Sequence, residues 1–326
     1  MSIQRMSLNT LAALVIGAVI ALTVSSGTVL SLLTQAIIYA VFAIGVGLLL
    51  RQNGMVSFGH ALYFGAAGYG IGIILQLGLM PAELAIVVTL AAIAIVGLLF
   101  GLVIVRVPGI AFGMLTLAIG QMFFLTASRA RGLTGGADGM SIDWPSTLFG
   151  ISQSVLLRPA NLFMLCWIVL VGIILLLALL LRSRFGSITE AVRDNEERAR
   201  FIGISTLLPR AAVYALSALV TGVGGVLSAL NTGFISPESL HWSLSGMTLM
   251  MVVVGGYKAL WGPALGAVVY FLFKDILGDY ADHWMAIFGI ALITVIVFSP
   301  TGIAGALQKL RFRHQATPAK AAVSSH

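Results

Sequence analysis

The sequence predicts an all-α fold, a polytopic membrane bundle of about ten transmembrane helices. Three observations favour this fold class. Hydrophobic residues make up 59% of the 326 residues, charged residues make up only 9%, and long stretches carry no Asp, Glu, Lys or Arg. An average soluble domain has about 25% charged residues, so this chain has too few charges to cover a water-exposed surface. The composition argues against a soluble enzyme, a nucleic-acid-binding protein and a disordered chain.

The charge-free stretches set the expected number of helices. A bilayer core about 30 Å thick needs roughly 20 apolar residues of helix. The first stretch, 6–50, is too long for one crossing, and Ser25-Ser26-Gly27 predicts a turn within it. Segments 244–257 and 262–277 are short, so half-helices there would reduce the count to eight or nine spans. The ten predicted segments are 9–25, 29–50, 58–79, 84–105, 110–127, 161–181, 211–230, 244–257, 262–277 and 284–303.

The Lys and Arg residues predict the orientation of these segments. Ten crossings place fourteen of the 18 Lys and Arg residues on the same side as the first residue. Because cytoplasmic loops carry the excess of positive charge, both termini are expected in the cytoplasm. Residues 1–305 are expected to form one transmembrane domain, and 306–326 a flexible, basic cytoplasmic tail. The other side holds only Arg129, Arg131, Arg158 and Lys274.

Small residues and a weak internal echo, a short motif that recurs later in the chain, predict how the helices pack. Glycine contributes 37 residues, and pairs such as Gly97 and Gly101 lie one turn apart. This spacing lets helix backbones approach closely in lipid. The motif Ile38-Tyr39-Ala40 through Gly45-x-Gly47 resembles Val213-Tyr214-Ala215 through Gly222-x-Gly224, five segments later. Segments five apart cross in opposite directions, so an inverted 5+5 repeat is a possible architecture.

The loop 182–210 is the longest one on the predicted inner side. Ser187 and Glu190 have the spacing of a capping box, and Gly203 is placed to end the helix. One amphipathic helix over 188–202 is therefore expected, lying on the bilayer, on the protein's own inner ends, or against a cytoplasmic partner. Its predicted i,i+4 pairs are Arg193–Glu197, Asp194–Arg198 and Glu196–Arg200, and its apolar stripe is Ile188, Ala191, Val192, Ala199 and Ile202.

The sequence carries no energy source of its own. There is no G-x-x-x-x-G-K-[ST] phosphate loop, so the chain is not expected to be an enzyme. No acidic residue lies in the middle of a predicted span, as ion-coupled carriers often require; Asp275, Asp279 and Asp282 cluster near an outer end. The single cysteine, Cys166, lies inside an apolar run and cannot form a disulfide within the chain. The chain is then a passive channel or the pore-forming subunit of a larger machine.

Four stretches, taken with the inner loop, resemble the membrane subunits of branched-chain amino acid ABC importers, specifically the LivM-type permeases. The similarity runs in the family's order from about residue 35 to 305. The inner stretch 190–203 is similar to the segment by which such permeases engage their ATPases, although Glu190-Ala191-Val192 departs from the Glu-Ala-Ala form of other ABC importers. The four stretches are Gly54–Gly65, Phe112–Gln121, Thr134–Gly139 and Ser245–Gly256 with Leu260–Gly266.

The resemblance implies a multi-pass protein of the bacterial inner membrane with several partners. These are a second, LivH-like permease, two cytoplasmic ABC ATPases and a periplasmic substrate-binding protein. ATP would be bound by the ATPases, so no cofactor and no metal are expected on this chain. The implied substrates are branched-chain or related hydrophobic amino acids, with urea or short amides as the alternative. The implied ATPase-coupling residues are Glu190, Ala191, Arg193, Asp194, Asn195, Arg198 and Gly203.

Two further sets of residues are hypotheses. His60, at the start of the third segment, is either a buried neutral histidine bonded to a carbonyl group or a substrate contact. The outer loop 134–139 either meets the binding protein or simply turns the chain. Two rival functions also stay open, a passive channel for a small neutral solute and a sodium-coupled carrier. The hypothetical substrate path is Ser57, His60, Thr116 and Gln121, and the hypothetical binding-protein contact is Gly135, Gly136 and Asp138.

Overall fold

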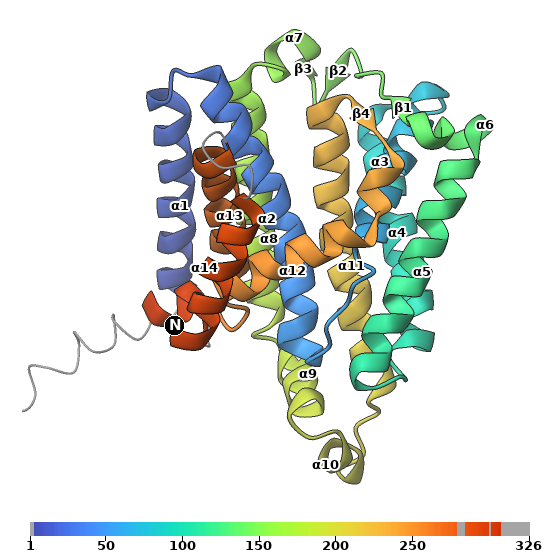
Figure 1. Cartoon of the computed structure of the whole chain (residues 1–326), viewed down its shortest axis with the longest axis vertical. Coiled ribbons are helices and arrows are strands. Elements are labelled where there is room, and N and C mark those ends of the chain that lie inside the picture. The colour runs from blue at the N-terminus through green and yellow to red at the C-terminus, as the bar shows by residue number, and fades with distance from the viewer. Residues whose placement is uncertain (1–2, 279–283, 300, 308–326) are drawn as a thin grey trace, which may run out of the picture.

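The computed structural model describes residues 3–278, 284–299 and 301–307. Ten helices occupy the ten predicted segments, which confirms the all-α membrane bundle (Figure 1). Asp279, Asp282 and the predicted tail from residue 308 onward lie outside the described residues. The ten helices are α1 (Ile3–Thr23), α2 (Gly27–Asn53), α3 (Ala61–Gln76), α4 (Ala82–Ile104), α5 (Gly109–Arg129), α8 (Pro159–Leu180), α11 (Leu207–Thr232), α12 (Trp242–Gly255), α13 (Gly262–Gly278) and α14 (Trp284–Phe298).

Short elements gather at the two ends of the bundle. At one end the helices α9 (Arg184–Asp194) and α10 (Glu196–Phe201) project beyond the long helices, and the first residues of α1 lie toward the same end (Figure 1). The opposite end carries the turns and two-stranded pairs that connect α5 to α8 and α11 to α12. These are α6 (Arg131–Thr134), η1 (Gly136–Asp138), β1 (Met140–Ser141), β2 (Thr147–Leu148), β3 (Ile151–Ser152), α7 (Gln153–Leu156), β4 (Phe234–Ile235) and η2 (Pro237–Leu240).

Helices α2 and α11 form the centre of the bundle. The most apolar stretch of each is 67% and 72% buried, against 22–33% for α4, α5 and α8, so those three outer helices leave most of their surface for lipid. Gly45 of α2 lies against Thr221 of α11, and a Cβ at Gly224 would lie only 3.3 Å from the carbonyl oxygen of Ile38. One glycine of each echoed motif, Gly45 and Gly224, therefore lies at the close central contact, whereas Gly47 faces Pro263 of α13 and Gly222 faces Ile93 of α4.

The central pair also fits the inverted order of the echoed motifs. Helices α2 and α11 run in opposite directions (Figure 1), and each is followed by a segment without α-helix and then a short α-helix. After α2 the chain passes through 54–60 into α3, and after α11 it passes through 233–241 into α12. Each half of the chain therefore contains one long central helix and one broken crossing, in which a segment without α-helix leads into a short helix: 54–60 into α3, and 233–241 into α12.

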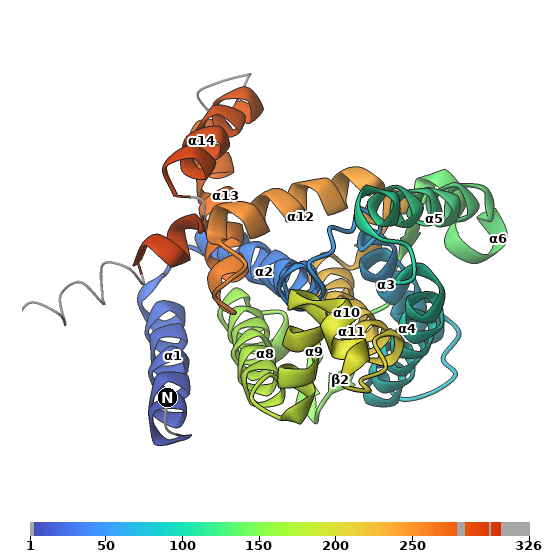
Figure 2. The same cartoon turned by 90° about the horizontal axis from the view of Figure 1, so that it is seen from below.

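The length and direction of α12 decide whether the predicted segment 244–257 is a full span or a half-helix. Its 14 residues span about 21 Å at 1.5 Å per residue, which is less than the roughly 30 Å of a bilayer core. It runs across the bundle rather than along it (Figures 1 and 2). The half-helix interpretation therefore holds for α12, while α13 turns back along the bundle axis beside α2.

Candidate functional site

The two broken crossings meet inside the bundle. Helix α3 begins at Ala61, whose backbone N–H has no partner within the helix because it belongs to the first turn. The Ser245 hydroxyl of α12 accepts a hydrogen bond from that N–H at 2.8 Å. Leu240, just before α12, lies against Gly65 of α3, where a Cβ would collide with its side chain. The start of one half-helix is therefore fixed by the other.

His60 is fully buried and links three segments through a chain of hydrogen bonds. The Ser217 hydroxyl donates to the carbonyl oxygen of Gly45 at 2.7 Å, so it accepts from His60 Nε2–H at 2.7 Å. His60 Nδ1 then accepts from the Ser57 hydroxyl, also at 2.7 Å. The chain of bonds requires the neutral ring with its proton on Nε2. It joins segment 54–60 to α11 and α2.

Thr116 fixes the same segment to α5. Its hydroxyl donates to the Gly113 carbonyl oxygen at 2.8 Å and accepts from the Phe58 backbone N–H at 3.2 Å. Any side chain at Gly59 would collide with the carbonyl group of Thr116, so the close approach of the two backbones requires glycine there. Segment 54–60 is thus bonded on one side to α5 and on the other to α11.

The structure brings three of the four predicted path residues together. Ser57, His60 and Thr116 all hold segment 54–60 and all are buried. Gln121 lies five residues beyond Thr116, about 7.5 Å along α5, and is half-buried with its Oε1 atom buried and unbonded among the described atoms. Ser217, the partner of His60, and Ser245, the partner of the Ala61 N–H, were not among the predicted site residues, because no local pattern links them to segment 54–60. The echoed motif containing Ser217 was the one signal that pointed toward that part of α11.

The inner loop contains two helices rather than the single helix that was predicted. Asn195 breaks the path with an extended backbone (φ −157°, ψ 103°) and caps α10 by accepting a hydrogen bond from Arg198 N at 2.9 Å. Ser183, not Ser187, caps α9. Gly203 ends α10 in the left-handed region with φ 85°, as expected.

The break also changes the predicted pairs and the apolar stripe. Only Glu196–Arg200 forms, at 2.6 Å, because the other two pairs span the break at Asn195. Arg193 instead pairs with the adjacent Asp194. The buried side chains are Thr189, Val192 and Ala199, whereas the predicted stripe residues Ala191 and Ile202 are exposed.

Helix α9 is bonded to the end of α2. The Thr189 hydroxyl donates to Gln52 Oε1 at 2.9 Å, and Arg193 Nη1 donates to the Arg51 carbonyl oxygen at 2.6 Å. The neighbouring Asn53 donates from Nδ2 to the Arg210 carbonyl oxygen of α11 at 3.0 Å. The ends of the two central helices that lie beside α9 are therefore tied to each other and to α9.

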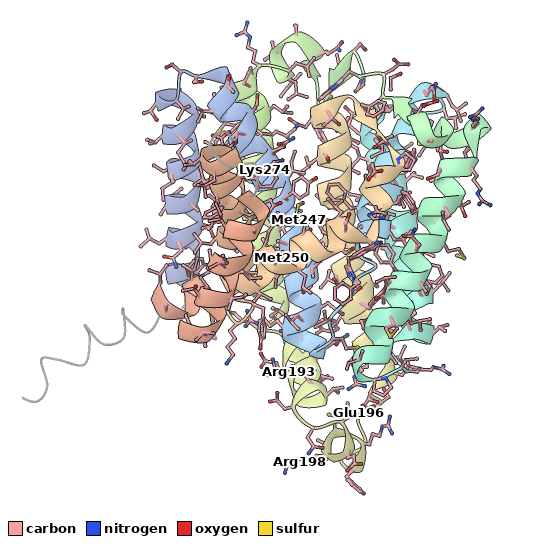
Figure 3. The ribbon with its side chains drawn as sticks, viewed as in Figure 1. Arg193, Glu196, Arg198, Met247, Met250 and Lys274 are labelled. Carbon is pink, nitrogen blue, oxygen red and sulfur yellow. The ribbon has the colours of Figure 1, made fainter. Side chains whose placement is uncertain are left out.

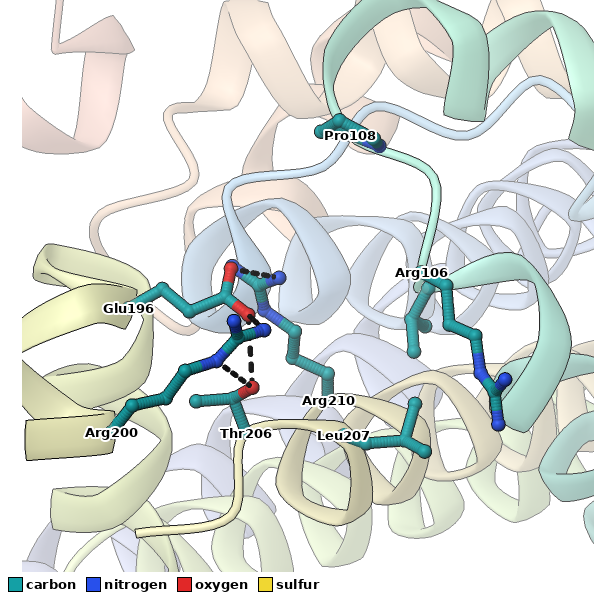
Figure 4. Close-up of a pocket in the computed structure, with 8 residues that line it drawn as sticks. Arg106, Pro108, Glu196, Arg200, Thr206, Leu207 and Arg210 are labelled. Carbon is teal, nitrogen blue, oxygen red and sulfur yellow. Dashed lines mark hydrogen bonds and ion pairs between the residues drawn. The ribbon is translucent and has the colours of Figure 1, made fainter. Parts of the chain in front are cut away.

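Helix α10 is bonded to the start of α11 through Glu196. Its carboxylate lies 2.6 Å from Arg210 Nη1 and accepts a hydrogen bond from the Thr206 hydroxyl at 2.9 Å (Figure 4). Burial raises the pKa of Glu196, but the Thr206 hydroxyl and the charges of Arg210 and Arg200 lower it by more. The resulting pKa lies below the usual range for a glutamate.

The seven predicted coupling residues share one property: all are exposed on α9, α10 or the turns beside them. Arg193, Glu196 and Arg198 lie at the projecting end of the molecule, far from Lys274 (Figure 3). The surface is hollowed on two sides of this projection. A pocket of about 360 Å³ lies between α10, α11 and the α4–α5 turn, and one of about 400 Å³ lies between α9, α2 and the α12–α13 turn.

The outer loop 134–139 is a compact turn. Gly135, Gly136 and Gly139 all have positive φ, and a Cβ at Gly135 would collide with the Gly139 carbonyl oxygen. The following strand β1 pairs with β4, with Met140 opposite Ile235. Asp138 is exposed at this turn. The glycines are thus required by the turn itself, and the part of the loop that is accessible to another protein includes Asp138.

Comparison with known proteins gives the chain its family. The family model for the permease component of branched-chain amino acid transport systems matches residues 28–297. The high-affinity branched-chain amino acid transport permease LivM of Salmonella typhimurium is 25% identical, over 93% of this chain and 76% of that protein. LivM of Escherichia coli is also 25% identical, over 86% of this chain and 70% of its own length.

A permease named for a different substrate also matches. The autoinducer 2 import system permease LsrC of Salmonella typhi is 26% identical, over 95% of this chain and 90% of its own length. No solved structure was found to match. The broken central crossings, the apolar outer helices and the family match over 28–297 together lead to one conclusion: the chain belongs to the family of branched-chain amino acid transport system permease components.

Proposed function

We propose that the chain is one of two permease subunits of an ABC importer that carries branched-chain amino acids across the bacterial inner membrane. A second permease, two cytoplasmic ATPases and an extracytoplasmic binding protein complete the assembly. Both termini and the α9–α10 projection face the cytoplasm in this proposal, since most of the Lys and Arg residues that the structure describes lie at the end of the projection. ATP is bound and hydrolysed by the ATPase partners.

One observation carries the proposal beyond family membership: the α9–α10 projection is bonded directly to both central helices. Thr189 and Arg193 bond to α2, and Glu196 bonds to α11. Closure of the ATPases against the exposed coupling residues would displace α9 and α10. The displacement would then reach the broken crossings, because α2 leads into segment 54–60 and α11 leads into 233–241.

The proposed substrate path keeps Ser57, His60, Thr116 and Gln121. In the conformation described here the first three bond to the protein itself, so they meet substrate only when segment 54–60 moves away from α5 or α11. Gln121 is the member with an unbonded acceptor atom. Alanine at each position should lower uptake and substrate-stimulated ATPase activity of the reconstituted complex. Unchanged values for all four variants, with intact assembly, would contradict the path.

Assembly can be tested by purifying the tagged chain from its own membrane in mild detergent and identifying the bound proteins by mass spectrometry. Two ATPases and a second permease are expected. Arg198→Glu should release the ATPases, because Arg198 is exposed on α10 and its side chain has no hydrogen bond or ion pair in the described structure. Arg129→Glu makes the same charge change at the outer end of α5 and should retain them. A solitary chain in a preparation where other membrane complexes stay intact would contradict the proposal.

The substrate class needs its own measurement. Proteoliposomes that contain the complete complex should accumulate leucine, isoleucine or valine only with ATP inside and binding protein outside. A flux of urea or acetamide that ignores ATP would instead favour a passive channel. A flux that collapses with the sodium gradient would favour a secondary carrier. ATP-driven accumulation of urea or an amide, but of no branched-chain amino acid, would keep the ABC assembly and replace the substrate.

A further inference from the structure

A strained aromatic residue lies at the tip of an outer hairpin. Strands β2 and β3 pair with Leu148 opposite Ile151, so the connecting loop is only Phe149-Gly150. Both loop residues have positive φ, 52° and 75°, as two-residue type I′ hairpins require. Glycine, asparagine and aspartate suit such positions, whereas a bulky side chain does not. Among the residues that the structure describes, Phe149 is the one non-glycine residue with positive φ.

Packing of the ring does not explain this conformation. The Phe149 side chain is 65% exposed, whereas the preceding Leu148 is 2% exposed and anchors the hairpin. The support comes through the backbone, because Phe149 N–H donates to Glu83 Oε1 of α4 at 2.7 Å. The fold therefore holds an aromatic ring away from the protein core in a backbone conformation that phenylalanine rarely adopts. An outlier of this kind at a surface tip points to a binding role.

The surroundings of the tip favour a partner with a basic side chain. A cavity of about 280 Å³ adjoins the hairpin, and its lining includes Glu83, Asp143, Trp144 and Thr147 but no Lys or Arg. The hairpin lies at the end of the molecule opposite α9 and α10, beyond the first residues of α4 and α8 (Figure 1). Glu83, which bonds the Phe149 backbone, and Asp143, in the adjoining cavity, suit a soluble protein with a cationic group, whereas they disfavour anionic lipid headgroups.

We propose that Phe149 is an anchor for the extracytoplasmic substrate-binding protein. The ring enters an apolar recess of the binding protein, and a Lys or Arg of that protein faces Glu83 and Asp143. Interfaces depend on a few such aromatic anchors surrounded by charged residues that orient the partners. This inference rests on the proposed function, and it adds a contact separate from the loop that contains Asp138.

The experiment uses the complete complex in lipid nanodiscs and the fluorescently labelled binding protein of the same transport system. Asparagine suits the left-handed conformation, so Phe149→Asn should keep or raise the thermal midpoint of unfolding while it weakens binding roughly tenfold. Phe149→Tyr keeps the ring and should bind within about twofold of the parent. Asp143→Asn should mainly slow association and reduce its dependence on salt.

The outcomes are distinct. Unchanged affinity in Phe149→Asn would overturn the proposal, as would a lowered thermal midpoint, which would make the ring a folding residue. A Phe149→Trp reporter should shift its emission to shorter wavelength when the binding protein is added. A shift on transfer from detergent to lipid, with no further change on adding the binding protein, would assign the ring to the membrane and also overturn it. If the parent complex binds no binding protein, the proposed function itself fails.

Discussion

The two broken crossings have the same plan but are held by different bonds. Segment 54–60, between α2 and α3, has Ser57, Gly59 and His60 buried, although Gly54 and Val56 are exposed. It is fixed mainly by the side chains of Ser57, His60 and Thr116. Segment 233–241, between α11 and α12, reaches the outer end and is fixed largely by backbone pairing of β4 with β1. Buried side-chain bonds are costly to leave unmade, whereas strand pairing tolerates many side chains. The first crossing therefore depends on particular residues more than the second does.

The sharpest test of this difference replaces the histidine that precedes each half-helix with alanine. His60→Ala should lower the free energy of unfolding by about 2–4 kcal/mol, because it opens a cavity and removes the partner of two buried hydroxyl groups. His241→Ala should cost only about 0.5–1 kcal/mol, since that ring is half-buried and its hydrogen bonds, both to Ser243 in the first turn of α12, are exposed to water. Denaturation of both variants in mild detergent measures the difference, and equal losses would remove the distinction between the crossings.

A matched threonine pair gives a smaller effect of the same kind. Thr116→Val should cost about 1–2 kcal/mol, because it leaves the Phe58 N–H without its acceptor. Thr232→Val should stay within about 0.5 kcal/mol, since the hydroxyl of Thr232, which bonds the Phe234 carbonyl oxygen, is exposed to water. The same denaturation assay applies. A larger loss at Thr232 than at Thr116 would reverse the assignment of the dependent crossing.

The inner ends of the two central helices should differ in their response to pH. The end of α2 is held by bonds from Thr189 and Arg193 to an amide oxygen and a backbone carbonyl oxygen, which carry no titrating proton, whereas the start of α11 is held by the carboxylate of Glu196. The folded pKa of Glu196 is lowered, so its stabilisation is present above the unfolded pKa, about 4.3. It is lost as the pH falls through the lower folded value.

The size of this effect is below about 1 kcal/mol, because Glu196 is partly exposed and water screens its ion pairs. Hydrogen exchange at pH 6 and pH 3, corrected for the intrinsic rate, should show 196–210 losing protection more than 184–192. Glu196→Gln should remove the difference. Equal loss in both segments, or a loss that persists in Glu196→Gln, would contradict the role given to this carboxylate.

Much of the fold follows from local properties of the sequence. The length and apolarity of each stretch are local, so α13 was predicted at 262–277 and found at Gly262–Gly278. The break at Asn195 was missed because the charge spacing around it also fits one continuous helix. The partners of His60 were missed for another reason: Ser217 lies 157 residues away, and only the folded bundle brings the two together. Phe149 gave no signal, since its left-handed backbone contradicts the usual preference of phenylalanine.

The break at Asn195 has a mechanical consequence. Because α9 is bonded to α2 and α10 to α11, a force applied near Asn195 is transmitted separately to each of the two central helices. The two receiving helices run in opposite directions, and Asn53 joins their inner ends through the Arg210 carbonyl group. Unequal forces on α9 and α10 would therefore rotate the two central helices about the Asn53–Arg210 contact rather than shift both in one direction. A continuous helix over 188–202 would transmit only one force, as a rigid rod does.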